Sequence, residues 1–127
     1  MSLEQASPQE LARIADLVSD ALTAAAVPWS YAGKPGERES AQLTVDDADD
    51  GRGVYITWEL SEREHTALMA LIEAGEFGDP AVLASGRKRQ EGLDRVAAVL
   101  RQAGIETVDP EDDFNPYTLE VVSAPDA

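Results

Sequence analysis

Cysteine is absent from this 127-residue chain, and histidine occurs only once, as His65. Without cysteine the chain can form no disulfide, no thiolate nucleophile and no cysteine-based zinc or iron–sulfur site. Small secreted domains usually carry such cross-links, so we expect a reducing compartment. A single histidine also excludes zinc sites built from several histidines. We therefore expect no cofactor and no bound metal.

Long apolar runs are also missing. The longest stretch without a charged residue is 21–33, and it contains Pro28. This stretch is too short for a membrane-spanning helix. The first residues show neither the basic nor the apolar region of a signal peptide. We expect a cytoplasmic protein that does not bind membranes.

Basic residues are scarce. Ten lysines and arginines stand against 25 aspartates and glutamates, for a formal net charge of −15. Such a field repels phosphate backbones and anionic lipids, so nucleic-acid and membrane-surface binding are disfavoured. Three explanations of the acid excess stay open: it keeps the protein in solution, it suits a high-salt cytoplasm, or it attracts a basic protein partner.

The motifs of common hydrolases and nucleotide-binding enzymes are absent as well. No serine has the flanking glycines of a nucleophile elbow. The chain also lacks a P-loop and the glycine fingerprint of dinucleotide-binding proteins. The remaining catalytic alternative is a small hydrolase or isomerase that uses His65 with a carboxylate. Because His65 shares a helical stripe with Leu68 and Ile72, a position at the margin of the core is favoured.

The first half of the chain carries clear local patterns. Ser7 and Glu10 form a capping box around Pro8, and apolar residues at three- and four-residue spacing then predict a helix over 8–26. Alternating apolar and polar residues predict a short edge strand near 27–31. The same alternation predicts a hairpin whose strands flank the turn 46–51.

The second half begins with two helical stretches. A second capping box at Ser61 starts a helix that ends near Gly75. The region 80–103 is either one long helix from Pro80 or a helix broken at Gly86. The basic cluster 87–89 bears on this choice, because cations at a helix start oppose the macrodipole. Either the helix starts near Pro80 or the cluster binds an anion, and the first explanation is simpler.

Two further strands, at 105–108 and 117–122, complete the pattern. The sequence therefore predicts an α+β fold in the order α-β-β-β-α-α-β-β, with a mainly antiparallel sheet and helices packed on one face. We expect a single domain over 1–127, with flexible tails at 1–6 and 123–127.

Two acidic stretches invite comparison with calcium sites. Aligning Gly51 with the glycine of an EF-hand places Ala48 and Thr57 at ligand positions, so an EF-hand is rejected and a solvated hairpin turn is favoured. The stretch 109–113 has enough carboxylates for a cation site with Asn115. Such a run is more typical of an exposed loop whose charges prevent edge-to-edge pairing.

Aromatic residues gather around the first strands and acidic residues around the loops. Large aromatic side chains are the usual anchors of protein interfaces, and carboxylates attract a basic partner over a distance. The candidate partner-binding residues are Trp29, Tyr31 and Tyr55 as anchors, with Asp47, Asp49 and Asp112 as steering charges.

In element order, size and acidity the chain resembles the type III secretion chaperone-like fold. Members of that family carry a helix, three strands, a helix, two strands and usually a closing helix. This chain departs from the pattern, because a third helix precedes the last strands and no helix follows Val122. The resemblance implies a dimeric, non-enzymatic protein that binds extended polypeptide.

The function that we expect is protein binding without catalysis. The acidic field and the exposed sheet face fit a small domain that is either chaperone-like or a regulatory or neutralising partner of a more basic protein. A homodimer is an alternative partner arrangement.

Overall fold

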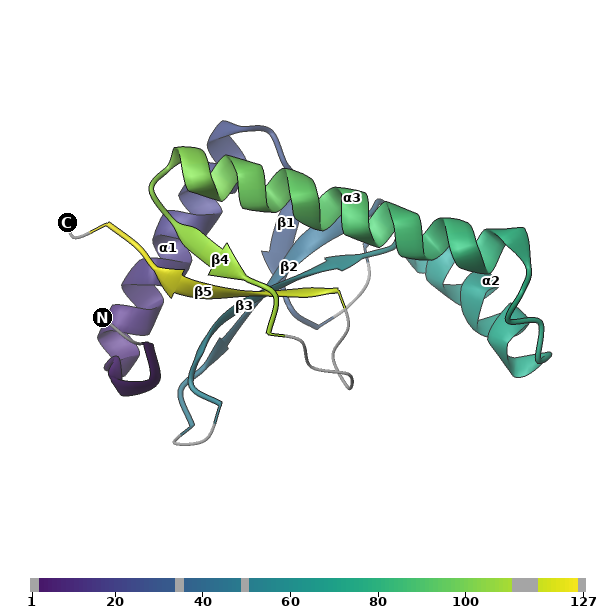
Figure 1. Cartoon of the computed structure of the whole chain (residues 1–127), viewed down its shortest axis with the longest axis horizontal. Coiled ribbons are helices and arrows are strands. Elements are labelled where there is room, and N and C mark those ends of the chain that lie inside the picture. The colour runs from purple at the N-terminus through teal and green to yellow at the C-terminus, as the bar shows by residue number, and fades with distance from the viewer. Residues whose placement is uncertain (1–2, 34–35, 49–50, 111–116, 126–127) are drawn as a thin grey trace.

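The computed structural model describes residues 3–33, 36–48, 51–110 and 117–125, and Figure 1 shows their arrangement. The elements are a short 3-10 helix η1 (Leu3–Gln5), α1 (Pro8–Ala24), β1 (Trp29–Tyr31), β2 (Ser40–Asp46), β3 (Gly53–Glu59), α2 (Glu62–Glu73), α3 (Pro80–Gln102), β4 (Glu106–Val108) and β5 (Thr118–Ser123). This order confirms the predicted α+β class and the predicted succession of helices and strands.

The strands form one five-stranded mixed sheet in the order β1-β2-β3-β5-β4. β1 pairs parallel with β2, and the other neighbouring strands are antiparallel. The β2–β3 hairpin pairs along its full length, from Ser40 opposite Glu59 to Asp46 opposite Gly53. Gly51 has a φ of 80° in the turn, in the left-handed region that favours glycine. The long hairpin is thus the framework to which the shorter strands add.

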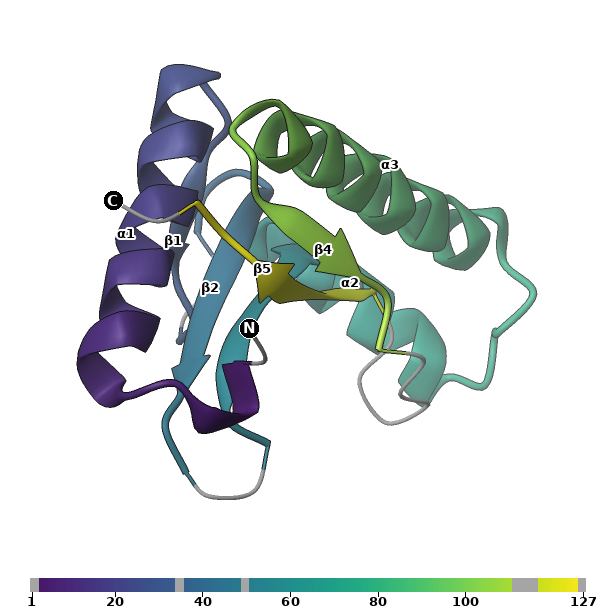
Figure 2. The same ribbon diagram turned by 60° about the vertical axis from the view of Figure 1, so that its left-hand side comes forward.

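Helices α1 and α3 cover one face of this sheet (Figures 1 and 2). Alternate strand residues point into the space between the helices and the sheet. Leu43 and Ile56 lie opposite each other there and are fully buried. In the segment 1–6, which was expected to be a tail, Leu3 and Ala6 are buried against this core. α1 and α3 therefore cover one face of the sheet, and the other face carries mainly polar side chains.

α3 is one continuous helix of 23 residues that begins at Pro80, so the unbroken alternative is the correct one. The Asp79 side chain accepts a hydrogen bond from the Ala81 N–H at its N-terminus. The basic cluster 87–89 therefore lies in the second and third turns and not at a helix start. Despite its length, α3 is not apolar enough to cross a membrane, and neither is any other helix in the described ranges.

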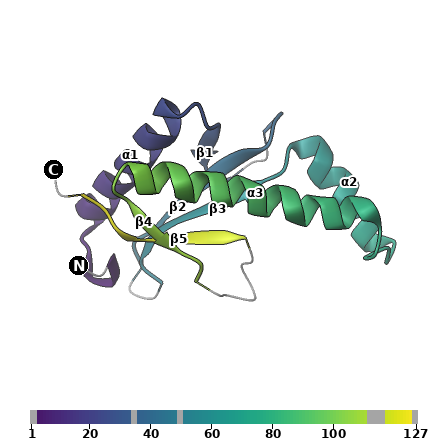
Figure 3. The same cartoon turned by 45° about the horizontal axis from the view of Figure 1, so that its top comes forward.

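α2 does not lie over the sheet. Figures 1 and 3 show α2 beyond the strand ends, alongside the N-terminal half of α3. Leu68 is the only buried residue of α2, whereas α1 contributes six. The Ser61 hydroxyl accepts from the Glu64 N–H and caps α2 as predicted. α2 and the N-terminal half of α3 therefore form an arm that packs little against the main core, whereas the C-terminal half of α3 supplies Leu93, Val96 and Leu100 to that core.

Candidate functional site

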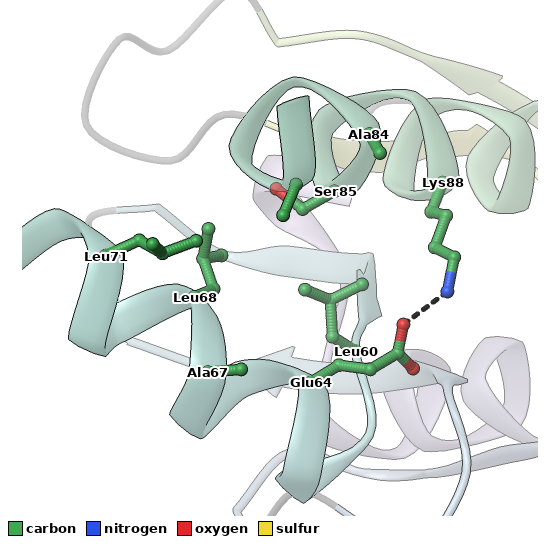
Figure 4. Close-up of a pocket in the computed structure, with 9 residues that line it drawn as sticks. Leu60, Glu64, Ala67, Leu68, Leu71, Ala84, Ser85 and Lys88 are labelled. Carbon is green, nitrogen blue, oxygen red and sulfur yellow. Dashed lines mark hydrogen bonds and ion pairs between the residues drawn. The ribbon is translucent and has the colours of Figure 1, made fainter. Parts of the chain in front are cut away.

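A groove runs between α2 and the N-terminal half of α3 (Figure 4). Leu60 and Leu68 are buried within it, and Leu71 is half-buried. Its volume is about 220 Å³. The space stays open because the residues that face each other across it are small. These small residues are Ala67 on α2 and Ala81, Ala84 and Ser85 on α3.

An ion pair closes the end of the groove nearest the sheet. Lys88 donates to the Glu64 carboxylate, and its Nζ lies 3.7 Å from the Glu39 carboxylate. The Ser61 hydroxyl also donates to Glu64, at 2.9 Å. The hydrogen bond from Lys88 is the main reason that the pKa of Glu64 lies below 4.5, and the same bond raises the pKa of Lys88 above 10.5. Both groups are charged at neutral pH.

A second and larger hollow lies on the sheet face that carries no described helix. It has a volume of about 510 Å³ and a lining that is partly polar and partly apolar. The strand register places Thr44 beside Tyr55 and places Tyr55 beside Glu120, so these residues share one face. The lining residues are Thr44, Asp46, Gly51, Tyr55, Thr57, Pro110, Thr118 and Glu120.

Tyr55 is held in one orientation within this hollow. Its hydroxyl donates to the Gly51 carbonyl at 2.7 Å. Its ring leans over Gly53, where a Cβ atom would lie 3.3 Å from the phenol Cζ. Glycine at position 53 therefore leaves the space that the ring occupies. A ring fixed in this way loses little conformational entropy when a ligand contacts it.

The charges of the hollow are negative. Among the described residues that line it, Asp46 and Glu120 supply carboxylates and none is a lysine or arginine. Asp46 keeps its place because its Oδ1 accepts from the Ala48 N–H at 3.0 Å. The Arg52 guanidinium donates to the carbonyls of Ala6 at 2.8 Å and Asp47 at 2.9 Å. An aromatic face beside two carboxylates is an arrangement that suits a guanidinium or ammonium group.

The structure brings some of the predicted anchors together and separates others. Trp29 and Tyr31 make an edge-to-face contact with centroids 5.6 Å apart. The Trp29 indole N–H donates to Thr23 at 2.8 Å, and Tyr31 is 53% exposed. Their register with β2 places them on the helix-covered face, opposite to Tyr55. The predicted anchors therefore do not form one surface.

The predicted steering charges lie at the loops. Asp47 is exposed in the β2–β3 turn, next to Asp46. Asp49 and Asp112 lie outside the described residues. The carboxylate of Glu120 was missed, because its neighbour across the sheet, Tyr55, comes from a strand more than sixty positions earlier. Only the pairing of β3 with β5 joins them.

His65 is half-buried on α2 and lines neither the groove nor the sheet hollow. Within the described ranges, no group of three or more histidine and carboxylate side chains is placed to hold a metal ion. No specific observation in the described residues therefore supports the hydrolase or isomerase alternative.

The groove between α2 and α3 was also missed by sequence reasoning. Its signal in the sequence is faint, since alanines at positions 67, 81 and 84 are ordinary helix formers. What distinguishes them is that they face one another across two helices. That relationship depends on how the helices pack.

Comparisons with known proteins give no relative. No protein-family model matches the chain, and no significant match was found among curated proteins or among solved structures. The two surfaces described above are therefore the features from which a function can be inferred.

Proposed function

We propose that the protein binds a basic segment of a partner protein on the face of its sheet that carries no described helix. The hollow around Tyr55 would receive a lysine or arginine side chain, with Asp46 and Glu120 as counter-charges. Holding such a segment is the step that a chaperone-like role and a neutralising role share. The observation that supports the proposal most directly is the position of Tyr55 between two carboxylates from different strands.

The whole-chain charge supports the same partner chemistry. A net charge of −15 raises the encounter rate with a basic protein and disfavours acidic competitors. The local groups then supply the short-range contacts. A cation over the Tyr55 ring contributes roughly 0.5–1 kcal/mol at a partly exposed site, and each exposed charge pair contributes about 0.2–1 kcal/mol. Together these terms contribute only about 1–3 kcal/mol, which describes a weak, salt-sensitive complex.

Binding of a labelled, unstructured arginine-rich peptide to the full chain tests the proposal. Fluorescence anisotropy should give an affinity that weakens as the salt concentration rises from about 50 mM to about 500 mM. The double variant Asp46→Asn with Glu120→Gln should weaken binding about fivefold to tenfold. Asparagine at position 46 retains the acceptor for the Ala48 N–H, so the turn is preserved.

A matched control separates the site from the general field. Asp20→Asn with Glu73→Gln removes the same charge from exposed positions on α1 and α2. This control should weaken binding by less than about twofold. Equal losses in the two double variants would show that the peptide senses only net charge, and the proposed site would be rejected. Tyr55→Ala should weaken binding further, whereas Tyr55→Phe retains the ring and most of the affinity.

A further inference from the structure

We propose that the basic segment bound in the sheet hollow carries an apolar residue two positions from its cation, and that this residue packs on Val108 of β4. The inference rests on the function proposed above, and it specifies which basic segments the site selects. Its basis is the strand register, which places an exposed apolar side chain beside a carboxylate of the hollow.

Four side chains form a row across the sheet, on the face that carries the hollow. Thr44 lies opposite Tyr55, and Tyr55 lies opposite Glu120. Glu120 in turn lies opposite Val108 on β4. Directly opposed residues of neighbouring strands have their side chains on the same face of a sheet. Val108 therefore extends the face to which Tyr55 and Glu120 belong.

Val108 differs in position from the other exposed apolar residues of the described chain. It is 44% exposed and lies on an edge strand. Of the five other large apolar side chains that are exposed, Tyr31 and Val45 belong to the helix-covered face, and the remaining three lie between positions 69 and 83. Within the described residues, Val108 is thus the one exposed large apolar side chain that the register places beside the hollow.

The two ends of the hollow differ in polarity. At the β2 end its lining is polar, with Thr44 and Asp46. At the other end its lining includes Pro110, which follows Val108 by two positions. A ligand whose cation contacts Glu120 therefore has apolar neighbours on the β4 side.

The spacing of the row matches the repeat of an extended chain. Neighbouring strands lie about 4.8 Å apart, so a cation held between Tyr55 and Glu120 lies about 7 Å from Val108. In an extended segment, successive side chains on one face are two residues and about 6.7 Å apart. A segment that crosses the strands thus places its next side chain of the same face over Val108. The residue between them points away from the sheet.

An apolar side chain is the one that gains most from this position. Contact between Val108 and a leucine, isoleucine or valine of the partner removes apolar surface of both side chains from water. This contribution does not depend on charge, so it remains when salt screens the ion pairs. It gives a sequence preference to a site whose charges alone would accept any basic segment.

Two labelled, unstructured peptides of identical composition test the inference with the full chain. Both carry a central arginine, further arginines at the ends, and a leucine on each side of the central arginine. The leucines lie two positions from it in one peptide and one position from it in the other, so the result does not depend on the direction of the segment. Fluorescence anisotropy should show that the two-position peptide binds about threefold to fivefold more tightly.

Substitution of Val108 should remove this preference. Val108→Ser should make the two affinities equal and should leave the salt-sensitive binding of both peptides in place. Val45→Ser is the matched control, because Val45 is 38% exposed on the other face of the sheet, and it should leave the preference unchanged. Val108→Thr, which keeps the branched shape of the side chain, should reduce the preference and serves if Val108→Ser fails to fold.

The outcomes separate this inference from the function on which it rests. Equal affinity of the wild type for the two peptides, with the salt dependence intact, would overturn the inference and leave the proposed function standing. A preference that survives in the Val108 variants would also overturn it, because another surface would then hold the leucine. If neither peptide binds the wild type, the inference and the proposed function are both wrong.

Discussion

Gly92 of α3 lies directly against the indole ring of Trp58 on β3. A Cβ atom at position 92 would overlap Cγ, Cδ2 and Cε2 of that ring, far inside van der Waals contact. Trp58 is only 4% exposed, and its indole N–H donates to Glu39 at 3.3 Å. The close approach of α3 to the sheet therefore depends on the absence of a side chain at position 92.

Gly92→Ala should destabilise the protein, although the same change in most helices is stabilising. Alanine normally gains about 0.5–1 kcal/mol over glycine inside a helix. Here the added methyl group must displace a buried aromatic ring, and overpacking of this kind costs about 1–3 kcal/mol or more. Urea unfolding should give a net loss of at least about 1 kcal/mol.

Gly86→Ala is the matched control for that change, because it lies in the same helix. A Cβ atom there would lie 2.7 Å from the Tyr117 hydroxyl, which is the far end of a side chain that can shift. We expect a change of less than about 1 kcal/mol. A stability of Gly92→Ala equal to or above that of Gly86→Ala would contradict the packing described here.

Ala26→Gly should stabilise the protein. Ala26 follows the end of α1 with a φ of 57°, in the left-handed region that favours glycine. Relief of that strain should add roughly 1 kcal/mol to the free energy of unfolding. Ala25, with a φ of −90°, supplies the control. Ala25→Gly should give no gain, and thermal unfolding of both variants in parallel measures the difference.

The Glu64–Lys88 pair should make a small, pH-dependent contribution to stability. The side chains are 33% and 48% exposed, so screening limits the contribution to less than about 1 kcal/mol. Because the folded-state pKa of Glu64 is depressed below 4.5, this contribution is present above that pH and is lost as pH falls through the folded-state pKa.

At high pH the deprotonation of Lys88 ends the contribution of the pair to stability. The folded-state pKa of Lys88 is raised above 10.5, so the contribution is complete below that pH and is lost as pH rises through the folded-state pKa. Glu64→Gln should remove the acid limb and most of the alkaline limb, of which Glu39 retains a part, and it keeps an acceptor for the Ser61 hydroxyl. Glu73→Gln, at an exposed position on α2, should leave the pH profile of unfolding intact. Identical profiles for the wild type and Glu64→Gln would show that the pair contributes nothing measurable.

His65→Ala should leave binding of the arginine-rich peptide unchanged within about twofold. His65 lines neither the sheet hollow nor the groove, so its removal takes no contact from either surface. The same anisotropy measurement, together with a circular dichroism spectrum of the variant, checks this. Abolished binding with a native spectrum would favour a functional site centred on the histidine.

Local sequence patterns correctly predicted much of the fold. Ser7 and Ser61 cap helices that begin one residue later, because a capping hydroxyl acts within a single turn. The alternation of apolar and polar residues around Leu43 and Ile56 predicted the hairpin and its buried face. This signal is also local, because successive residues of a strand point to opposite faces of the sheet. The split of Trp29 and Tyr31 from Tyr55 was not predicted, because it depends on the register between two strands that are separated by a loop.

The amino-acid sequence by itself determined the order of the elements, their approximate bounds and the strong negative charge, because each depends on composition or on residues a few positions apart. Only the tertiary structure decided that β5 pairs with β3, that α3 runs unbroken across Trp58, and that alanines on two helices face each other around a groove. These features depend on contacts between distant segments, and packing energies over the whole chain select among the arrangements that local patterns allow.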